Sequence, residues 1–139
     1  MTSTYNRPLP NPQPEWDHYW EKAKAHELWI MSCDACNQTY FYPRAICPNC
    51  FSRETKWIKA SGRGTLFAFA IVHRAPTPAF AEMAPYVTAF VQLEEGPRFP
   101  TNLVEVHADP SAIKIGMAVE VVFDDVTDAI TLPKFRPAS

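Results

Sequence analysis

Apolar and polar residues alternate over most of the second half of the chain, and this pattern predicts β-strands. The strand expected at 64–74 has two apolar faces, one with Leu66, Ala68, Ala70 and Val72 and the other with Phe67, Phe69, Ile71 and His73. Such a strand is expected to be buried on both sides or to bend across a barrel. Shorter strands are expected at 85–93, 98–106, 118–123 and 129–132, with a helical turn at 109–116. About five strands over residues 57–137 suit a small barrel such as an OB-fold.

The N-terminal part follows a different pattern. Prolines at 8, 10, 12 and 14 predict an extended arm over residues 1–14. Residues 15–28 contain neither Gly nor Pro and predict a helix. Trp16, Trp20 and Ala23 recur at helical spacing and form one apolar stripe. We expect this stripe to pack on the body of the protein, and a ligand wall or a subunit contact is the alternative.

All four cysteines lie in one short segment as two Cys-x2-Cys pairs, Cys33 with Cys36 and Cys47 with Cys50. Two such knuckles can surround one ion with a tetrahedron of sulfur, which selects zinc or iron. A redox dithiol or a disulfide pair is the alternative. Four thiolates leave no open coordination position for a substrate, so the predicted ion is structural.

Composition and charge restrict the classes of function. The 139 residues suit one ordinary domain, are 47% hydrophobic and carry a net charge of −2, which argues against a general nucleic-acid coat protein. Residues 44–74 carry six basic side chains and one acidic side chain, so this window could meet a phosphate-bearing ligand or be a solvated surface. A signal peptide and a long apolar run are both missing from the sequence, so we expect a cytoplasmic protein without a membrane segment.

Motifs for catalysis are missing from the sequence. It contains no Gly-x-Ser-x-Gly elbow, no His-Glu-x-x-His and no P-loop. Gly62-Arg-Gly64 lacks the third glycine of a dinucleotide loop and is interpreted as a bulge or the start of the barrel. His73 and Arg74, beside the apolar proline loop 75–85, are the strongest polar candidates, although a structural role is the alternative. No catalytic residue is predicted.

Several motifs in order define a resemblance. They are the tryptophan helix, the two knuckles with Pro-Arg between them, Gly-Arg-Gly-Thr, Val72-His-Arg-Ala-Pro, Pro85-Tyr-Val and Leu132-Pro-Lys-Phe-Arg-Pro. Over about residues 15–137 the chain resembles the family of rubredoxin-like zinc ribbon plus OB-fold proteins, first classed as a domain of unknown function and now called acyl-CoA-associated. The resemblance implies a mainly β protein with a helix at 15–28, a zinc ribbon at 29–56 and a five-stranded OB-fold barrel at 57–137. Asn37 and Phe51 stand where related ribbons often have glycine.

The resemblance also implies a function. Such proteins are non-catalytic accessory subunits that bind or orient an acyl-CoA thioester for a thiolase-superfamily partner, which is a thiolase, an aldolase or an acyltransferase encoded beside them. Arg63 and Arg74 are the expected phosphate donors. The residues expected to contact the ligand or the partner are Trp16, Trp20, Arg63, Phe67, Phe69, His73, Arg74 and Phe80. A single-stranded nucleic-acid-binding module is the second hypothesis, and a stand-alone acyl-CoA hydratase or thioesterase is the third.

Overall fold

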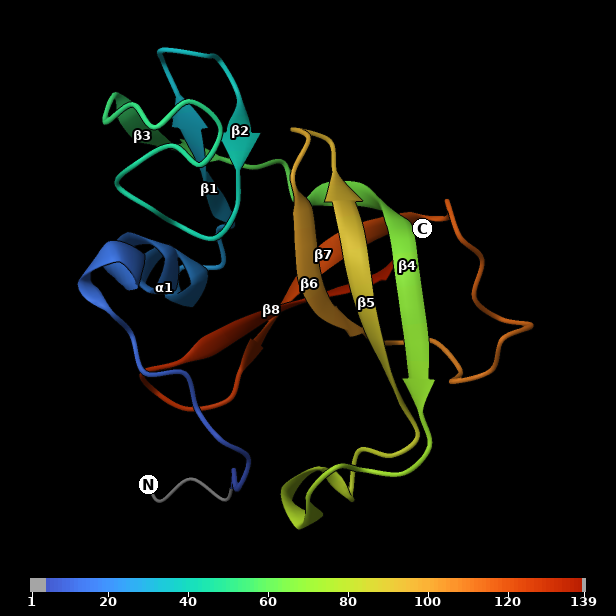
Figure 1. The fold of residues 1–139 in the computed structure, drawn as a ribbon. Coiled ribbons are helices and arrows are strands. Elements are labelled where there is room, and N and C mark those ends of the chain that lie inside the picture. The colour runs from blue at the N-terminus through green and yellow to red at the C-terminus, as the bar shows by residue number, and fades with distance from the viewer. Residues whose placement is uncertain (1–4, 139) are drawn as a thin grey trace.

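A computed structural model describes residues 5–138 (Figure 1). One short helix and a three-stranded sheet of order β2-β1-β3 precede a closed barrel of order β4-β5-β6-β8-β7. The predicted fold class, mainly β with an N-terminal helix, a zinc ribbon and a five-stranded OB-fold barrel, is confirmed. Within the described residues, no helix is long and apolar enough to cross a membrane.

The N-terminal helix is shorter than the predicted range 15–28. A 3-10 turn (Pro14–Trp16) leads into α1 (Asp17–Lys24). The helix ends there because His26 adopts a left-handed φ of 62°, which an α-helix does not allow. Residues 5–13 of the predicted arm form no helix or strand, and residues 1–4 lie outside the described residues.

The ribbon sheet contains β1 (Trp29–Cys33), β2 (Thr39–Tyr40) and β3 (Thr55–Lys59). Both outer strands pair antiparallel with β1. β3 crosses the expected boundary between ribbon and barrel, since Trp57 pairs with Met31 and packs against the cluster that contains Cys33 and Cys47. The segment that leads into the barrel is therefore part of the ribbon sheet.

The barrel contains β4 (Arg63–Val72), β5 (Tyr86–Leu93), β6 (Arg98–Leu103), β7 (Ala118–Asp125) and β8 (Thr131–Pro137). Its strands pair antiparallel except β6 and β8, which meet in parallel at Leu103 and Phe135.

Three predicted boundaries in the barrel half are wrong. The last strand spans 131–137 rather than 129–132, because Pro133 and Pro137 occupy strand positions that tolerate the missing N–H. The strand expected at 98–106 stops at Leu103, before Glu105 adopts a φ of 57°. Residues 109–116 form turns and no helix.

A bulge in β4 changes which side chains face the core. The β4–β5 register shifts between Leu66 and Ala68, and such a shift moves the following side chains to the opposite face. Leu66 is buried, and Phe69 and Ile71 pack against the core, whereas Phe67 is 44% exposed. The predicted assignment of faces is therefore wrong beyond the bulge, and β4 is buried on one side only.

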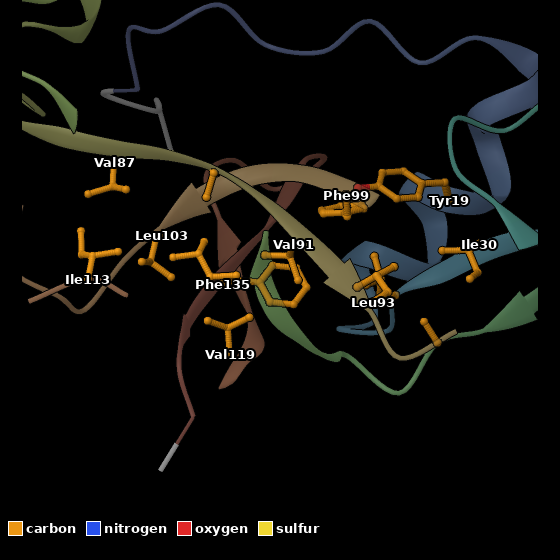
Figure 2. Packing of buried hydrophobic residues seen from close by; sticks show 14 residues of the cluster. Tyr19, Ile30, Val87, Val91, Leu93, Phe99, Leu103, Ile113, Val119 and Phe135 are labelled. Carbon is orange, nitrogen blue, oxygen red and sulfur yellow. The ribbon is translucent and has the colours of Figure 1, made fainter. Parts of the chain in front are cut away.

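One hydrophobic core connects the helix, the ribbon and the barrel. Figure 2 shows Tyr19 of α1 and Ile30 of β1 near Leu93 and Phe99, with Phe135 farther inside the barrel. Thr39 Oγ1 of the ribbon donates a hydrogen bond across the same junction to the Glu95 carbonyl, and the bond from the Ala60 N–H to the Leu28 carbonyl extends the pairing of β1 with β3 up to it. The ribbon is thus fixed to the barrel by packing and by a hydrogen bond.

Candidate metal centre and ligand-facing surfaces

Two matching turns carry the four cysteines. In each knuckle a backbone N–H returns to the carbonyl of the first cysteine, Asn37 to Cys33 at 2.8 Å and Phe51 to Cys47 at 2.9 Å. Asn37 and Phe51 adopt φ values of 60° and 65°, so these two residues reach the left-handed turn without glycine, as the sequence predicted. Phe51 does so with a side chain that is 77% exposed.

The four sulfur atoms have the geometry of a tetrahedral metal site. All four lie within 4.8 Å of one another, with 3.6 Å between Cys33 and Cys50 and 3.7 Å between Cys36 and Cys47. Zinc–sulfur bonds of about 2.3 Å in a tetrahedron require sulfur–sulfur separations of about 3.8 Å. The thiols therefore fit one tetrahedral ion, and the predicted ligand set is confirmed as a group that can hold a metal.

The surroundings of the sulfur atoms shift the pKa values of two of the thiols in opposite directions. A hydrogen bond from the Asn49 side chain, helped by the Gln38 backbone, lowers the pKa of Cys36 to about 6. For Cys50, a backbone hydrogen bond at Ser52 acts to lower the pKa, but burial and the other three sulfurs raise it to about 12. Four thiolates this close repel one another, so a bound cation is needed to hold all four deprotonated.

The four-cysteine ligand set is of the kind that holds a structural ion. Four cysteine ligands complete a tetrahedron and leave no position for water or substrate. Among residues 5–138, the four cysteines are the one cluster of metal-ligating side chains. When it is bound, the ion would hold the two knuckles together, because this segment buries few apolar side chains of its own.

The two tryptophans of the predicted ligand set pack at the junction of the helix with the ribbon. Trp16 lies 6.4 Å from Trp20 and 5.6 Å from Phe41, measured between ring centroids. Both tryptophans pack against the hydrophobic core. The expected packing on the body of the protein accounts for both side chains, and a role for them in ligand binding stays a prediction.

His73 and Arg74 line an open hollow of about 430 Å³ together with Pro76, Pro78 and Ala84. The loop that forms it projects from the end of β4 and β5 that is far from the ribbon (Figure 1). Phe80 lies in the same loop, with its ring 6.1 Å from that of Tyr86. The structure thus places His73 and Arg74 at one hollow, and Phe80 belongs to the same loop but is not among the residues that line the hollow.

Arg63 lies elsewhere. It begins β4 and lines a separate hollow of about 550 Å³ with Glu94 and Glu120. Arg63 begins β4 and Arg74 lies two residues beyond its end, and a strand of this length is roughly 30 Å long. The two arginines predicted as phosphate donors therefore cannot grip one phosphate together, and two carboxylates border the Arg63 hollow.

The outer side of β4, β5 and β6 carries an apolar surface. It consists of Phe67, Ala68, Ala70, Thr88, Phe90 and Pro100, and we call it the β4–β6 outer face. Arg98 lies against it, with its guanidinium 3.8 Å from the centre of the Phe67 ring. Sequence reasoning selected Phe67 and missed Phe90 and Arg98. The strict alternation of buried and exposed residues along β5 could have identified Phe90.

A polar contact that the sequence did not predict joins the end of α1 to the barrel. His26 Nε2 lies 3.0 Å from both carboxylate oxygens of Asp125, and its ring stacks on Phe123. Hydrogen bonds from Thr131 first, and then from His26, lower the pKa of Asp125. The partners are far apart in sequence, so no local spacing pointed to them.

Family models match two segments of the chain. Residues 20–55 match the rubredoxin-like zinc ribbon domain of ChsH2, and residues 57–124 match its C-terminal OB-fold domain. A DUF35 domain-containing scaffold protein of Methanocaldococcus jannaschii is 40% identical over 130 residues, which cover 88% of this chain and 87% of the relative. A probable enoyl-CoA hydratase alpha subunit of Thermomonospora curvata is 39% identical over 95% of this chain, but the chain spans only 40% of that relative's length.

A solved structure shows the same architecture. It is described as an Ltp2-ChsH2(DUF35) aldolase, and the matched chain is 37% identical to this one with a TM-score of 0.81. The match covers 94% of this chain and 100% of the other. A DUF35 protein of Sulfolobus solfataricus is 10% identical with a TM-score of 0.61 and supports the fold alone.

Proposed function

Because the chain belongs to the DUF35 family, with the zinc ribbon and OB-fold of ChsH2, we propose that it is the non-catalytic accessory subunit of an aldolase-type enzyme of the thiolase superfamily. The observation that carries this proposal is the likeness to one chain of the structure described as an Ltp2-ChsH2(DUF35) aldolase, which extends over the whole of that chain, together with the match to both ChsH2 domain models. A domain that matches a complete subunit of a complex is expected to work as such a subunit.

The chemistry of the described residues supports an accessory role. The cysteines are committed to one metal site, so none is left as a nucleophile. His73 lines an open hollow, and none of the hydrogen bonds found within residues 5–138 joins it to a carboxylate that could make it a general base. The partner would supply the nucleophile and the base, and this chain would supply binding surface. Zinc is the proposed ion, since the ribbon matches a zinc ribbon model and four thiolates suit zinc.

We further propose that the hollow at His73 and Arg74 receives part of an acyl-CoA thioester. Arg74 is exposed and could donate two hydrogen bonds to a phosphate, and the neighbouring prolines and alanines offer apolar contact. An open hollow of this kind cannot enclose a ligand of this size alone, because pockets for such ligands usually bury most of their surface. The ligand would therefore be held between this chain and its partner.

Coexpression tests the proposal. The chain is produced with the thiolase-superfamily protein encoded beside it, and the partner alone, the chain alone and the copurified complex are assayed with a series of acyl-CoA esters. We expect no turnover by the chain alone and full turnover by the complex only. Arg74→Ala should raise KM for the CoA ester about fivefold or more with little change in kcat, and Arg53→Ala, at an exposed arginine of the ribbon, should leave KM unchanged.

Two results would contradict the proposal. Recovery of the chain as a free monomer, with the neighbouring enzyme fully active unaided, removes the accessory role. Turnover of a CoA ester by the chain alone would instead favour the stand-alone hydratase or thioesterase. An unchanged KM in Arg74→Ala, with complex formation intact, refutes only the position of the ligand.

A further inference from the structure

The β4–β6 outer face has side chains that an ordinary solvent-facing sheet surface does not need. Phe67 is 44% exposed and Phe90 is 47% exposed, and small or apolar residues lie between them. The surface is hollowed by about 470 Å³ along Ala68, Ala70, Phe90 and Pro100. The three strands lie side by side in Figure 1, so these side chains form one continuous patch. Contiguous exposed apolar patches of this kind mark interaction sites.

The bulge in β4 produces this patch. Without the register shift, Ala68 and Ala70 would share the buried face of Leu66 and would not lie on the same side as Phe67. With it, consecutive residues Phe67 and Ala68 both belong to the exposed side of the sheet. The same shift turns Phe69 and Ile71 into the core, so the bulge serves the packing of the barrel and leaves Phe67 with the two alanines on the outer side.

Three arginines lie at the ends of the strands that carry the patch, and Glu94 and Glu120 lie beside one of them, Arg63. Arg63 begins β4 and Arg98 begins β6 at the end nearer the ribbon, and Arg74 follows β4 at the other end. None of these arginines takes part in the ion pairs found among residues 5–138. Arg98 donates to the Gln92 side chain at 3.3 Å and covers the Phe67 ring. The carboxylate of Glu94, at the end of β5, accepts a hydrogen bond from Ser61.

We infer that the β4–β6 outer face is the surface on which the partner enzyme docks, and that the docked surface of the partner is apolar with carboxylates at its edge. This inference rests on the proposed function, since it names the side of the chain that the partner covers. Aromatic residues and arginine are the residue types enriched at protein interfaces, and the unpaired arginines complement acidic groups.

Single-stranded nucleic acid and a small ligand fit the β4–β6 outer face less well than a protein surface does. Single-stranded nucleic acid needs several free aromatic faces for base stacking, whereas Arg98 already covers one face of Phe67, and Phe90 at the centre of the patch is flanked by Ala68 and Pro100. A small ligand needs a concavity that encloses it, whereas the two phenylalanines of this patch remain nearly half exposed. A broad protein surface satisfies both observations.

Affinity measurements on the assembled system test the inference. The neighbouring thiolase-superfamily protein, purified alone, is titrated with wild-type chain, Phe90→Asp and Arg98→Glu. A buried aromatic at the centre of an interface dominates affinity, so Phe90→Asp should weaken binding by about 30-fold or more, and Arg98→Glu by about tenfold.

Matched controls lie in the loop between β6 and β7. Ile115→Asp changes an apolar side chain that is 61% exposed, and Lys114→Glu reverses an exposed charge; both should bind within about twofold of wild type. Phe90→Leu should keep most of the affinity. Because Phe90 is on the outside of the sheet, all variants should retain zinc and melt normally, and hydrogen exchange in the wild-type complex should show protection of residues 86–93 and 98–103.

The outcomes separate the inference from the proposed function. Wild-type affinity in both Phe90→Asp and Arg98→Glu, or no protection of these strands, overturns the docking surface and leaves the accessory role intact. A loss of affinity in Ile115→Asp as large as that in Phe90→Asp also overturns the docking surface. Failure of the wild-type chain to bind the enzyme refutes the proposed function itself. Binding of a dT15 oligonucleotide that is lost in Phe90→Asp assigns the face to nucleic acid and overturns the inference.

Discussion

Two glycines with the same backbone conformation should respond very differently to alanine. Gly62 has a φ of 81° where the chain passes from the ribbon into the barrel, and Gly116 has a φ of 88° in the loop before β7. A Cβ on Gly62 would lie 2.5 Å from Cγ1 of Val121, whereas a Cβ on Gly116 would meet nothing within 4 Å. The pair therefore separates the cost of backbone strain from the cost of a clash.

The expected loss of unfolding free energy is the sum of the backbone strain and the steric clash. A left-handed conformation costs an L-residue about 1–2 kcal/mol, so Gly116→Ala should lower the free energy of unfolding by that amount. Gly62→Ala carries the same strain and must also displace Val121 in a packed region, which costs about 1–3 kcal/mol more. We expect a total loss of about 2–5 kcal/mol for Gly62→Ala, or a melting temperature lower by about 8–20 °C at about 4 °C per kcal/mol.

Chemical denaturation with excess zinc measures both variants, and the double variant Gly62→Ala with Val121→Ala provides the control. Removing the Val121 methyl groups removes the clash, so it should restore part of the extra free energy of unfolding that Gly62→Ala loses relative to Gly116→Ala. It also removes packing, so the recovery should be incomplete. Equal losses in Gly62→Ala and Gly116→Ala, or an additive loss in the double variant, would refute the steric argument.

Three further predictions concern the metal site, the contact between His26 and Asp125, and the hydrophobic core. Cys47→Ser should reduce bound zinc from about one ion per chain to a small fraction by elemental analysis, and wild-type chain should lose zinc on acidification because its thiolates must take up protons. The pKa of Asp125 is lowered by Thr131 and His26, so its contribution to stability is complete above its ordinary pKa of about 3.9 and is lost as pH falls through the lowered value. The stability difference between wild type and Asp125→Asn should therefore shrink as the pH falls below about 4; a difference that grows below pH 4 contradicts the assignment. Phe135→Ala, at a fully buried position, should cost about 3–5 kcal/mol in urea denaturation, whereas a cost under about 1 kcal/mol would disprove its central place in the core.

Local chemistry made the ribbon and the general fold predictable from the sequence. Two Cys-x2-Cys pairs favoured a metal site over a redox dithiol or disulfide pair, and the family resemblance pointed to Asn37 and Phe51 as the positions that must turn without glycine. The alternation along β5 is also local, and the strand ends there as expected within one residue.

Features that depend on contacts between distant segments were not predictable. The bulge after Leu66 is set by pairing with β5, so the sequence alone put the later side chains of β4 on the wrong face. β8 is longer than expected because its pairing with β7 holds two prolines in extended positions. His26 and Asp125 are 99 residues apart, and only the closed barrel brings them together. Each predicted ligand residue was identified from its own neighbours in the sequence. The separation of Arg63 from Arg74 was not predictable in this way, because it follows from the path of β4.

The hydrogen bond from Thr39 to the backbone of Glu95 has a consequence for how the metal and the partner influence each other. Thr39 belongs to the ribbon, and Glu95 lies in the turn that joins β5 to β6, the two strands that carry Phe90 and Arg98. If loss of the ion loosens β2 of the ribbon, this support of the hairpin is weakened and docking of the proposed partner becomes coupled to zinc binding. Thermodynamic reciprocity then requires that a partner bound to the hairpin strengthens zinc binding by the same factor by which zinc strengthens docking. The zinc affinity of the free chain and of the complex would therefore report on assembly at a distance from the ion.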